Sequence, residues 1–187
     1  MIKRAFDLLL AVPALILLAI PLVAVGLWVR ASSPGPALYW SRRVGANGHL
    51  FPMPKFRSMR TDTPAMATHL LTSPEAWLTP IGGLLRRSSI DELPQLWSII
   101  RGHMSIVGPR PALFNQNDLV DLRRQHGIDG LRPGLTGWAQ VNGRDEISIP
   151  DKVALDAEYF RRMSVLFDLR IIALTASKVL HRSDVSH

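Results

Sequence analysis

The longest apolar run of the chain lies near its beginning. From Leu8 to Val29 no side chain is charged or strongly polar. A helix of this length, rising about 1.5 Å per residue, reaches across a hydrocarbon core of roughly 30 Å. Pro13 and Pro21 interrupt the run, and each removes a backbone donor and clashes with the carbonyl four residues earlier. The pattern predicts an apolar helix kinked at its prolines.

Basic residues flank this run on both sides, namely Lys3, Arg4, Arg30, Arg42 and Arg43. Cytoplasmic flanks of membrane segments carry an excess of Lys and Arg, so a single span would leave one basic flank on the wrong side. A helix that bends near Pro21 and returns to its starting face satisfies both flanks. We therefore expect a re-entrant membrane hairpin over residues 1–31, with a single membrane span as the alternative.

One carboxylate stands at the edge of the apolar run. Asp7 is unfavourable there unless it is paired, and Arg4, three residues earlier, can face it on a helix. We expect an ion pair between Asp7 and Arg4 that seats the helix at the membrane interface.

Residues 32–187 form the second predicted domain, which begins with a breaker at Ser32–Pro36. Ala37–Ser41 and Leu50–Met59 read as extended pieces joined by a turn at Asn47-Gly48, which predicts a small β-hairpin. Residues 61–80 read as loop with one short helix, and 131–143, rich in Gly and Pro, as loop or short strand.

Helical patterns fill most of the remaining sequence. Leu93, Leu96, Trp97 and Ile100 recur at helical spacing before Gly102, which predicts a helix with one apolar face. Further helices are expected at 81–87, 115–125, 150–163 and 167–180. The predicted fold is therefore mainly α with a small β element, an α+β class, with amphipathic helices at the membrane interface.

Charge and composition narrow the choice of partners. The net charge is +7 and the isoelectric point is near 10.7, so the surface attracts nucleic acid, anionic lipid or a phosphorylated substrate. The apolar run favours the membrane reading over nucleic acid. The chain has no cysteine, which excludes disulfides, cysteine-ligated zinc and thiol nucleophiles.

Two adjacent carboxylates, Asp91 and Glu92, are the strongest candidates for chemistry. Ser89 and Glu92 have the spacing of a capping box, so helix capping alone can explain the acids. If Ser89 were the N-cap, however, Pro94 would fall at the fifth helical position, where its missing N–H would cost the helix one backbone hydrogen bond. A helix starting at Asp91 avoids this. Both carboxylates then lie at the positive helix end near Arg86, where an ionised carboxylate can act as a nucleophile or hold a divalent cation.

Five motifs follow one another in order, namely Lys3–Asp7, Pro54–Met59, Asp91–Gln95, Gly102–Pro111 and Arg132–Arg144. Together they resemble the bacterial sugar transferase family, the monotopic phosphoglycosyl transferases, over nearly the whole chain. The length is similar to that of the small members, which consist of the catalytic core alone. One departure is the Ile20-Pro21 pair, which stands where some members break the re-entrant helix at Ser-Pro.

The resemblance implies transfer of a sugar 1-phosphate from a UDP-sugar to polyprenyl (undecaprenyl) phosphate, with release of UMP, as the first step of glycoconjugate assembly. It implies that Asp91 attacks the β-phosphate and forms a covalent phospho-sugar intermediate. Glu92 would act as a base towards the acceptor or help to position Mg²⁺, for which Asp91 and Glu92 are the expected ligands. Residues 32–187 would be a catalytic domain on the cytoplasmic face of the bacterial inner membrane.

Fixed cations are expected around such phosphates. By membership of the motifs, Lys55, Arg86, Arg110 and Arg144 are the candidates for phosphate binding, and Asp156 is a further acidic site residue. For Gly134, Gly137 and Gly143 we expect close backbone approach or positive φ.

Two other classes of function remain as alternatives. A catalytically inert, membrane-attached scaffold would bind anionic lipid through its basic surface and would need the acid pair only for capping. A nucleic-acid-binding protein would show salt-sensitive binding to DNA or RNA.

Overall fold

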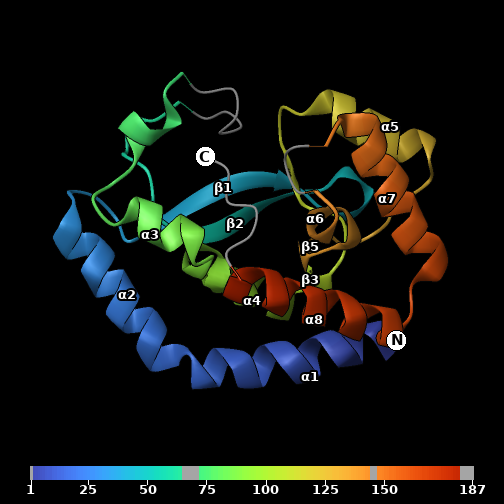
Figure 1. Cartoon of the computed structure of the whole chain (residues 1–187), viewed down its shortest axis with the longest axis horizontal. Coiled ribbons are helices and arrows are strands. Elements are labelled where there is room, and N and C mark those ends of the chain that lie inside the picture. The colour runs from blue at the N-terminus through green and yellow to red at the C-terminus, as the bar shows by residue number, and fades with distance from the viewer. Residues whose placement is uncertain (1, 65–71, 144–146, 182–187) are drawn as a thin grey trace.

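The computed structural model describes residues 2–64, 72–143 and 147–181. Helices predominate in these ranges (Figure 1). The α-helices are α1 (Ile2–Leu17), α2 (Ala19–Ser32), α3 (Gly82–Arg87), α4 (Leu96–Ile100), α5 (Asn117–Gln125), α6 (Trp138–Val141), α7 (Ile149–Arg162) and α8 (Val165–His181). The strands and 3-10 helices are β1 (Leu38–Val44), β2 (Leu50–Phe56), β3 (Ser105–Val107), β4 (Ala112–Leu113), β5 (Gly134–Thr136), η1 (Ala46–Gly48), η3 (Pro74–Trp77) and η4 (Ile90–Gln95).

The predicted β-hairpin is confirmed. Strands β1 and β2 pair antiparallel from Leu38 opposite Phe56 to Val44 opposite Leu50. Asn47 and Gly48 in the turn take positive φ values of 54° and 77°, which is the conformation that an Asn-Gly turn favours. The second edge of β1 pairs with β4, and a separate parallel pair joins β3 to β5. The α+β class therefore holds.

The segment 131–143 contains more structure than a loop. It contains strand β5, which pairs with β3, and then the one-turn helix α6. Four residues make too short a stretch for hydrophobic periodicity to show, so the sequence pattern did not indicate α6.

The N-terminal helices form a bent pair. Among the described residues, no single helix is long and apolar enough to cross a membrane; α1 and α2 meet that test only together, and they are bent by 61°. The break falls at Leu18, directly after Leu17, whose carbonyl lacks its helical donor because residue 21 is proline. Helix α1 continues through Pro13, where we expected a second kink.

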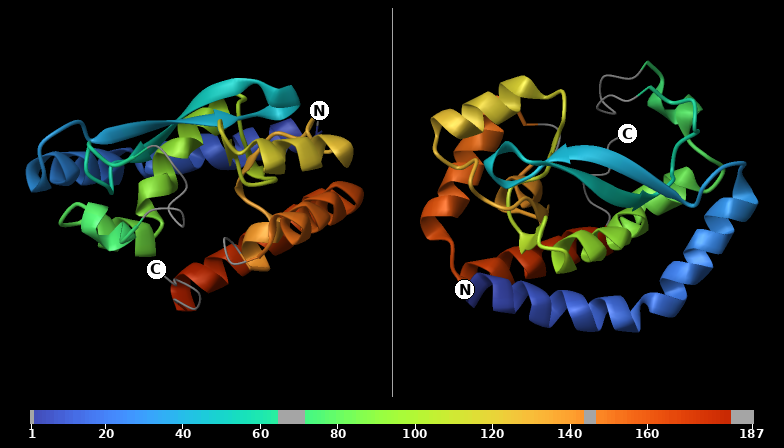
Figure 2. Two further views of the ribbon diagram at one scale, coloured as in Figure 1. Left: turned by 90° about the horizontal axis from the view of Figure 1, so that it is seen from above. Right: turned by 180° about the vertical axis from the view of Figure 1, so that it is seen from behind.

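One face of the bent pair packs against the rest of the protein. Ala11 of α1 is fully buried with Leu96 and Ile99 of α4, and Val29 of α2 is buried with Phe56 and Leu85. Figure 2 shows α1 and α2 along the outside, with α3, η4 and α4 between them and the β1–β2 hairpin. The opposite face is apolar and exposed, through Leu9, Ile16, Leu17, Ile20, Val23 and Leu27.

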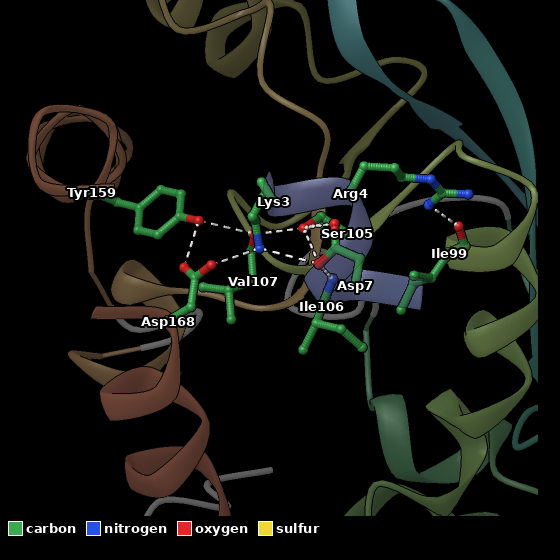
Figure 3. Close-up of polar contacts among 9 residues, drawn as sticks. All are labelled: Lys3, Arg4, Asp7, Ile99, Ser105, Ile106, Val107, Tyr159 and Asp168. Atoms are coloured by element: carbon green, nitrogen blue, oxygen red, sulfur yellow. Dashed lines mark hydrogen bonds and ion pairs between the residues drawn. The ribbon is translucent and has the colours of Figure 1, made fainter. Parts of the chain in front are cut away.

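A buried ionic network ties α1 to the core, and its partners differ from the predicted ones (Figure 3). Asp7 accepts hydrogen bonds from the Ser105 hydroxyl at 2.9 Å and from the Ile106 N–H at 3.0 Å. It also pairs with Lys3 at 3.2 Å. The expected Asp7–Arg4 pair is wrong, because Arg4 instead donates to the carbonyls of residues 99 and 100 at the end of α4.

The same lysine reaches the last described helix. Lys3 lies 2.8 Å from Asp168 of α8, and Asp168 accepts a second contact at 2.8 Å from the Tyr159 hydroxyl of α7. Asp7 and Asp168 are 1% and 0% exposed, so both carboxylates depend on these partners for their stability in the fold. The network fixes α1 against β3, α7 and α8.

Candidate active site

The acid pair lies in the tight helix η4, beside strand β2. Ser89 precedes it in the left-handed conformation with φ +57°, and the Glu92 N–H bonds to the Ser89 carbonyl at 3.1 Å. The helix therefore starts at Ile90, and the prediction that Asp91 is its N-cap is wrong. The sequence argument assumed an α-helix, whereas the first turns are 3-10 and become α-helical only at Leu96. The Ser89 side chain makes no capping bond.

Cations from three different elements surround the two carboxylates. Lys55 of β2 lies 2.6 Å from Oε1 of Glu92, and Arg110, which follows β3, lies 3.7 Å from the same oxygen. Arg86 lies in the last turn of α3, where its charge lowers the pKa of Asp91 and one of its Nη atoms contacts the sulfur of Met59 at 3.4 Å. Three of the four predicted cations are therefore gathered at the acid pair. Arg144 lies outside the described residues.

The two carboxylates differ in proton affinity. Burial raises the pKa of Asp91, Lys55 lowers it, and the neighbouring Glu92 charge raises it again, to about 6. Burial also raises the pKa of Glu92, but the charges of Lys55 and Arg110 outweigh that effect and bring it to about 2. Glu92 is thus the firmly ionised member, while Asp91 is a buried carboxylate with raised basicity. A pair whose proton affinities are driven apart in this way is typical of catalytic sites.

A narrow cavity opens beside Glu92. Its polar walls are formed by Arg43, Lys55, Glu92, Gln95 and Arg110. Gln95 is only 2% exposed. Sequence reasoning missed both Arg43 and Gln95 as site residues, although Gln95 belongs to the motif that contains the acid pair.

The two neighbouring arginines of β1 point to opposite faces of the strand. Arg43 donates to the Ser41 hydroxyl at 2.9 Å and to the Pro111 carbonyl at 3.1 Å, on the cavity side. Arg42 is exposed and stacks over the ring of Phe114 at 5.2 Å. Because side chains alternate along a strand, Arg43 lies on the same face as the buried Ser41, and the sequence alone did not show which face that is.

Asp156 is connected to the site through another arginine. Arg123 of α5 places two guanidinium nitrogens on one oxygen of Asp156, at 3.0 and 2.7 Å. Its third nitrogen donates to the Arg110 carbonyl at 2.9 Å. Asp156 therefore orients Arg123, and Arg123 in turn holds the backbone carbonyl of Arg110. Arg123, which sequence reasoning also missed, is the link.

Glycines allow the loop before Arg110 to pack closely. A Cβ at Gly134 would lie 2.1 Å from the Gly108 nitrogen, and one at Gly137 would lie 2.1 Å from the Gly108 oxygen. This close approach, which the sequence predicted, holds Gly108 against β5. The turn that carries Arg110 is thereby placed next to the acid pair.

The donor set fits a magnesium ion held mainly by substrate. Among the described residues no group of three or more Asp, Glu, His or Cys side chains could hold a metal. Mg²⁺, however, usually takes one or two protein carboxylates and completes its shell with water and substrate phosphates. Asp91 and Glu92 would supply those two carboxylates.

The fold and the site are those of a protein suited to phosphate chemistry. Two adjacent carboxylates, one with a raised pKa, lie among positively charged side chains that can bind phosphate groups. The family model for bacterial sugar transferases matches residues 1–182. The chain therefore belongs to the bacterial sugar transferase family.

Relatives of the chain are found in several bacteria. It is 42% identical, over 95% of its length and 38% of the relative, to UDP-glucose:undecaprenyl-phosphate glucose-1-phosphate transferase of Xanthomonas campestris pv. campestris. It is 39% identical, over 95% of its length and 84% of the relative, to exopolysaccharide production protein ExoY of Sinorhizobium fredii. Undecaprenyl-phosphate galactose phosphotransferase of Salmonella typhimurium is 35% identical, over 97% of the chain and 41% of the relative. The chain thus spans about two fifths of the Xanthomonas and Salmonella proteins.

Proposed function

We propose that this protein transfers a sugar 1-phosphate from a UDP-sugar to undecaprenyl phosphate and releases UMP. The observation that carries the proposal is the buried Asp91, whose pKa of about 6 reflects raised basicity, beside the cation-bound Glu92. The names of the Xanthomonas and Salmonella relatives, which specify undecaprenyl phosphate and a glucose or galactose phosphate, support the same reaction class.

In the proposed first step, a carboxylate oxygen of Asp91 attacks the β-phosphorus of the donor. The bond from that phosphorus to the bridging oxygen breaks, and its electron pair leaves with UMP. Lys55, Arg86 and Arg110 provide fixed positive charge for the diphosphate, and such preorganised charge is usually the largest source of rate enhancement in phosphoryl transfer. The product is an aspartyl phospho-sugar on Asp91.

In the second step, a phosphate oxygen of the lipid acceptor attacks the same phosphorus. The bond to Asp91 breaks and the electron pair returns to the carboxylate. Of the two roles expected for Glu92, help in holding Mg²⁺ is favoured over that of a base, because a pKa of about 2 makes it a weak proton acceptor. Bound Mg²⁺ would neutralise phosphate charge and so reduce the repulsion between the diphosphate and an attacking carboxylate.

UMP release is the direct test of this function. The purified protein, assayed with undecaprenyl phosphate, Mg²⁺ and a panel of UDP-sugars, should release UMP with at least one donor. Asp91→Asn should abolish release, whereas the matched change Asp121→Asn, in an exposed pair with Arg124, should leave it intact. Undiminished release by Asp91→Asn would remove the nucleophile assignment, whereas absence of release by the unmodified protein with every donor would favour the inert-scaffold alternative.

The covalent intermediate has its own test. Incubation with the donor in the absence of acceptor should add the mass of one sugar phosphate to the peptide that contains Asp91. Release of UMP without such an adduct, under conditions in which the acceptor is strictly required, would point to direct transfer instead.

We also propose that α1 and α2 form a re-entrant hairpin at the cytoplasmic face of the bacterial inner membrane. Their bend of 61° and their exposed apolar face support this placement. Helix α8 adds to the apolar surface with Leu166, 78% exposed, and Leu169, 46% exposed. A tag before Ile2 should be protected from periplasmic labelling, as should Lys152. Labelling of the tag alone would establish a true span.

A further inference from the structure

Arg57 is a buried cation that the chemistry of the acid pair does not use. It directly follows strand β2, in the motif that supplies Lys55, and only 4% of it is exposed. Its guanidinium donates to the carbonyls of Ser33, Pro34 and Pro36 at 2.8, 2.5 and 2.8 Å. These acceptors lie where the chain leaves α2, whose C-cap is Ser33. Arg57 therefore ties the exit of the hairpin to the strand that carries Lys55.

The exit segment is shaped to fit this guanidinium. Pro34 and Pro36 have no N–H, so the main chain offers only their carbonyls for hydrogen bonding. Gly35 between them takes a φ of +118°, and a Cβ there would lie 3.1 Å from an Nη atom of Arg57 and 3.0 Å from a methyl carbon of Thr61. The planar fork of arginine reaches three converging acceptors at once, which the compact ammonium of lysine does less well.

The other end of the bent pair has a similar tie (Figure 3). Arg4, in the first turn of α1, donates to the carbonyls of Ile99 and Ile100 at 2.6 and 2.8 Å. These carbonyls end α4, which continues directly from η4 and its acid pair. Each end of the bent pair is thus bound through an arginine to one of the two elements that carry the site. The contact of Lys55 with Glu92 at 2.6 Å joins those two elements.

Under the proposed membrane placement, these ties fix a distance that the second step needs. The polyprenyl chain of the acceptor lies in the bilayer, so its phosphate stays at the depth of the lipid headgroups. The apolar face of α1 and α2 fixes the depth of the hairpin in the same bilayer. The height of the acid pair over the acceptor phosphate is therefore set by the contacts of the hairpin with β2 and α4. The soluble donor needs no such height.

We propose, on the basis of the function and the membrane placement proposed above, that Arg57 is a positioning residue for the lipid acceptor. It holds β2 and the acid pair at the height at which the acceptor phosphate meets the phospho-sugar on Asp91. Lys55 is held independently of this tie by the β1–β2 ladder, in which it lies opposite Tyr39. The first step, with the soluble donor, therefore does not depend on Arg57.

Kinetics in bilayer nanodiscs separate the two steps. In a transfer through a covalent intermediate, kcat/KM for the donor reports the first step and kcat/KM for the acceptor reports the second. Arg57→Met should lower kcat/KM for polyprenyl phosphate roughly ten- to a hundredfold, because a misplacement of about 1 Å can cost on the order of a hundredfold. The value for the UDP-sugar should stay unchanged, and Arg57→Lys should recover part of the loss. A variant that merely folds poorly would lower both values by the same factor, so equal losses, or no loss, would overturn the proposal.

Two further variants keep the test independent of folding. Gly35→Ala disturbs the same tie from the side of the exit segment while Arg57 is retained, and it should impair the acceptor step alone. Arg60→Gln, which removes an exposed pair with Asp62, is the matched control and should leave both values intact. In detergent micelles with a short-chain polyprenyl phosphate, whose phosphate is not held at a fixed depth, the loss in Arg57→Met should shrink. An equal loss in micelles and bilayers would contradict the role in setting height.

A distance measurement without turnover distinguishes this inference from the proposed function. The chain has no cysteine, so nitroxide labels at Leu27→Cys of α2 and Leu50→Cys of β2, both exposed positions, report the separation of hairpin and strand by pulsed electron paramagnetic resonance. Arg57→Met should shift or broaden the distribution of distances, and an unchanged distribution would remove Arg57 as the tie. Failure of the proposed function would appear separately, as absence of UMP release by the unmodified protein with every donor.

Discussion

Replacing the proposed nucleophile should make the protein more stable. Asp91 is 7% exposed, and burial is the first cause of the rise of its pKa from 3.8 to about 6. The folded state therefore holds a proton on this carboxyl more tightly than the unfolded state does. By linkage, stability is lost as the pH rises from about 4 through about 6, and the loss is complete near pH 7.

The size of the effect follows from the pKa. One pKa unit corresponds to about 1.4 kcal/mol, so the ionised Asp91 destabilises the fold by roughly 3 kcal/mol at neutral pH. Asp91→Asn supplies a neutral side chain of the same shape. For a chain of this length the variant should melt roughly 6–12 °C higher at pH 7. Below pH 4, where Asp91 is itself protonated, the two proteins should melt together.

Thermal unfolding in detergent between pH 4 and pH 8 measures this difference. EDTA is included so that no divalent cation neutralises the acid pair. Asp121→Asn, in which an exposed ion pair is removed, is the control and should shift the melting temperature little at any pH. A lower melting temperature for Asp91→Asn at pH 7, or a difference that does not depend on pH, would refute the reasoning.

Three further predictions follow from contacts described above. Asp168→Asn should lower stability by about 2–3 kcal/mol, because Lys3 loses a buried ionic partner at 2.8 Å; an unchanged unfolding curve would contradict this. Arg123→Met should raise the KM for the UDP-sugar more than it lowers kcat, because the Arg110 carbonyl loses its 2.9 Å donor; equal KM values for variant and unmodified protein would count against that link. Pro21→Ala should restore the donor to the Leu17 carbonyl and straighten the bent α1–α2 pair, which under the proposed membrane placement would expose an N-terminal tag to periplasmic label; full protection of the tag would show that other contacts set the bend.

Local chemistry made part of the fold predictable. The β-hairpin was predictable because Asn47-Gly48 specifies its own turn. A helix was expected at 150–163, and α7 runs from Ile149 to Arg162, where the Ser148 hydroxyl at its start accepts from the Asp151 N–H. The acid pair was readable because its residues are adjacent in sequence. Such features depend on interactions within a few residues, which a linear pattern contains.

Contacts between distant segments were not predictable in the same way. Asp7 could be recognised as needing a partner, but its partners Ser105 and Ile106 lie about a hundred residues away. Lys3, four residues earlier on the same helix, was also within reach of a helical-wheel argument, but the prediction named Arg4 instead. Arg43 was one of several basic flanking residues until β4 and the Pro111 carbonyl fixed the face on which it lies. The pattern of residue types was sufficient to find the site, while tertiary contacts decide which side chains complete it.

The bridge that Lys3 makes between Asp7 and Asp168 has a consequence for biogenesis. Lys3 and Asp7 lie together on α1, whereas Asp168 lies far along the chain on α8. During synthesis α1 therefore leaves the ribosome long before α8 does, and Lys3 must stay without its second carboxylate until α8 has been made. The contact of α1 with α8 is thus completed only after the segments between them have been synthesised.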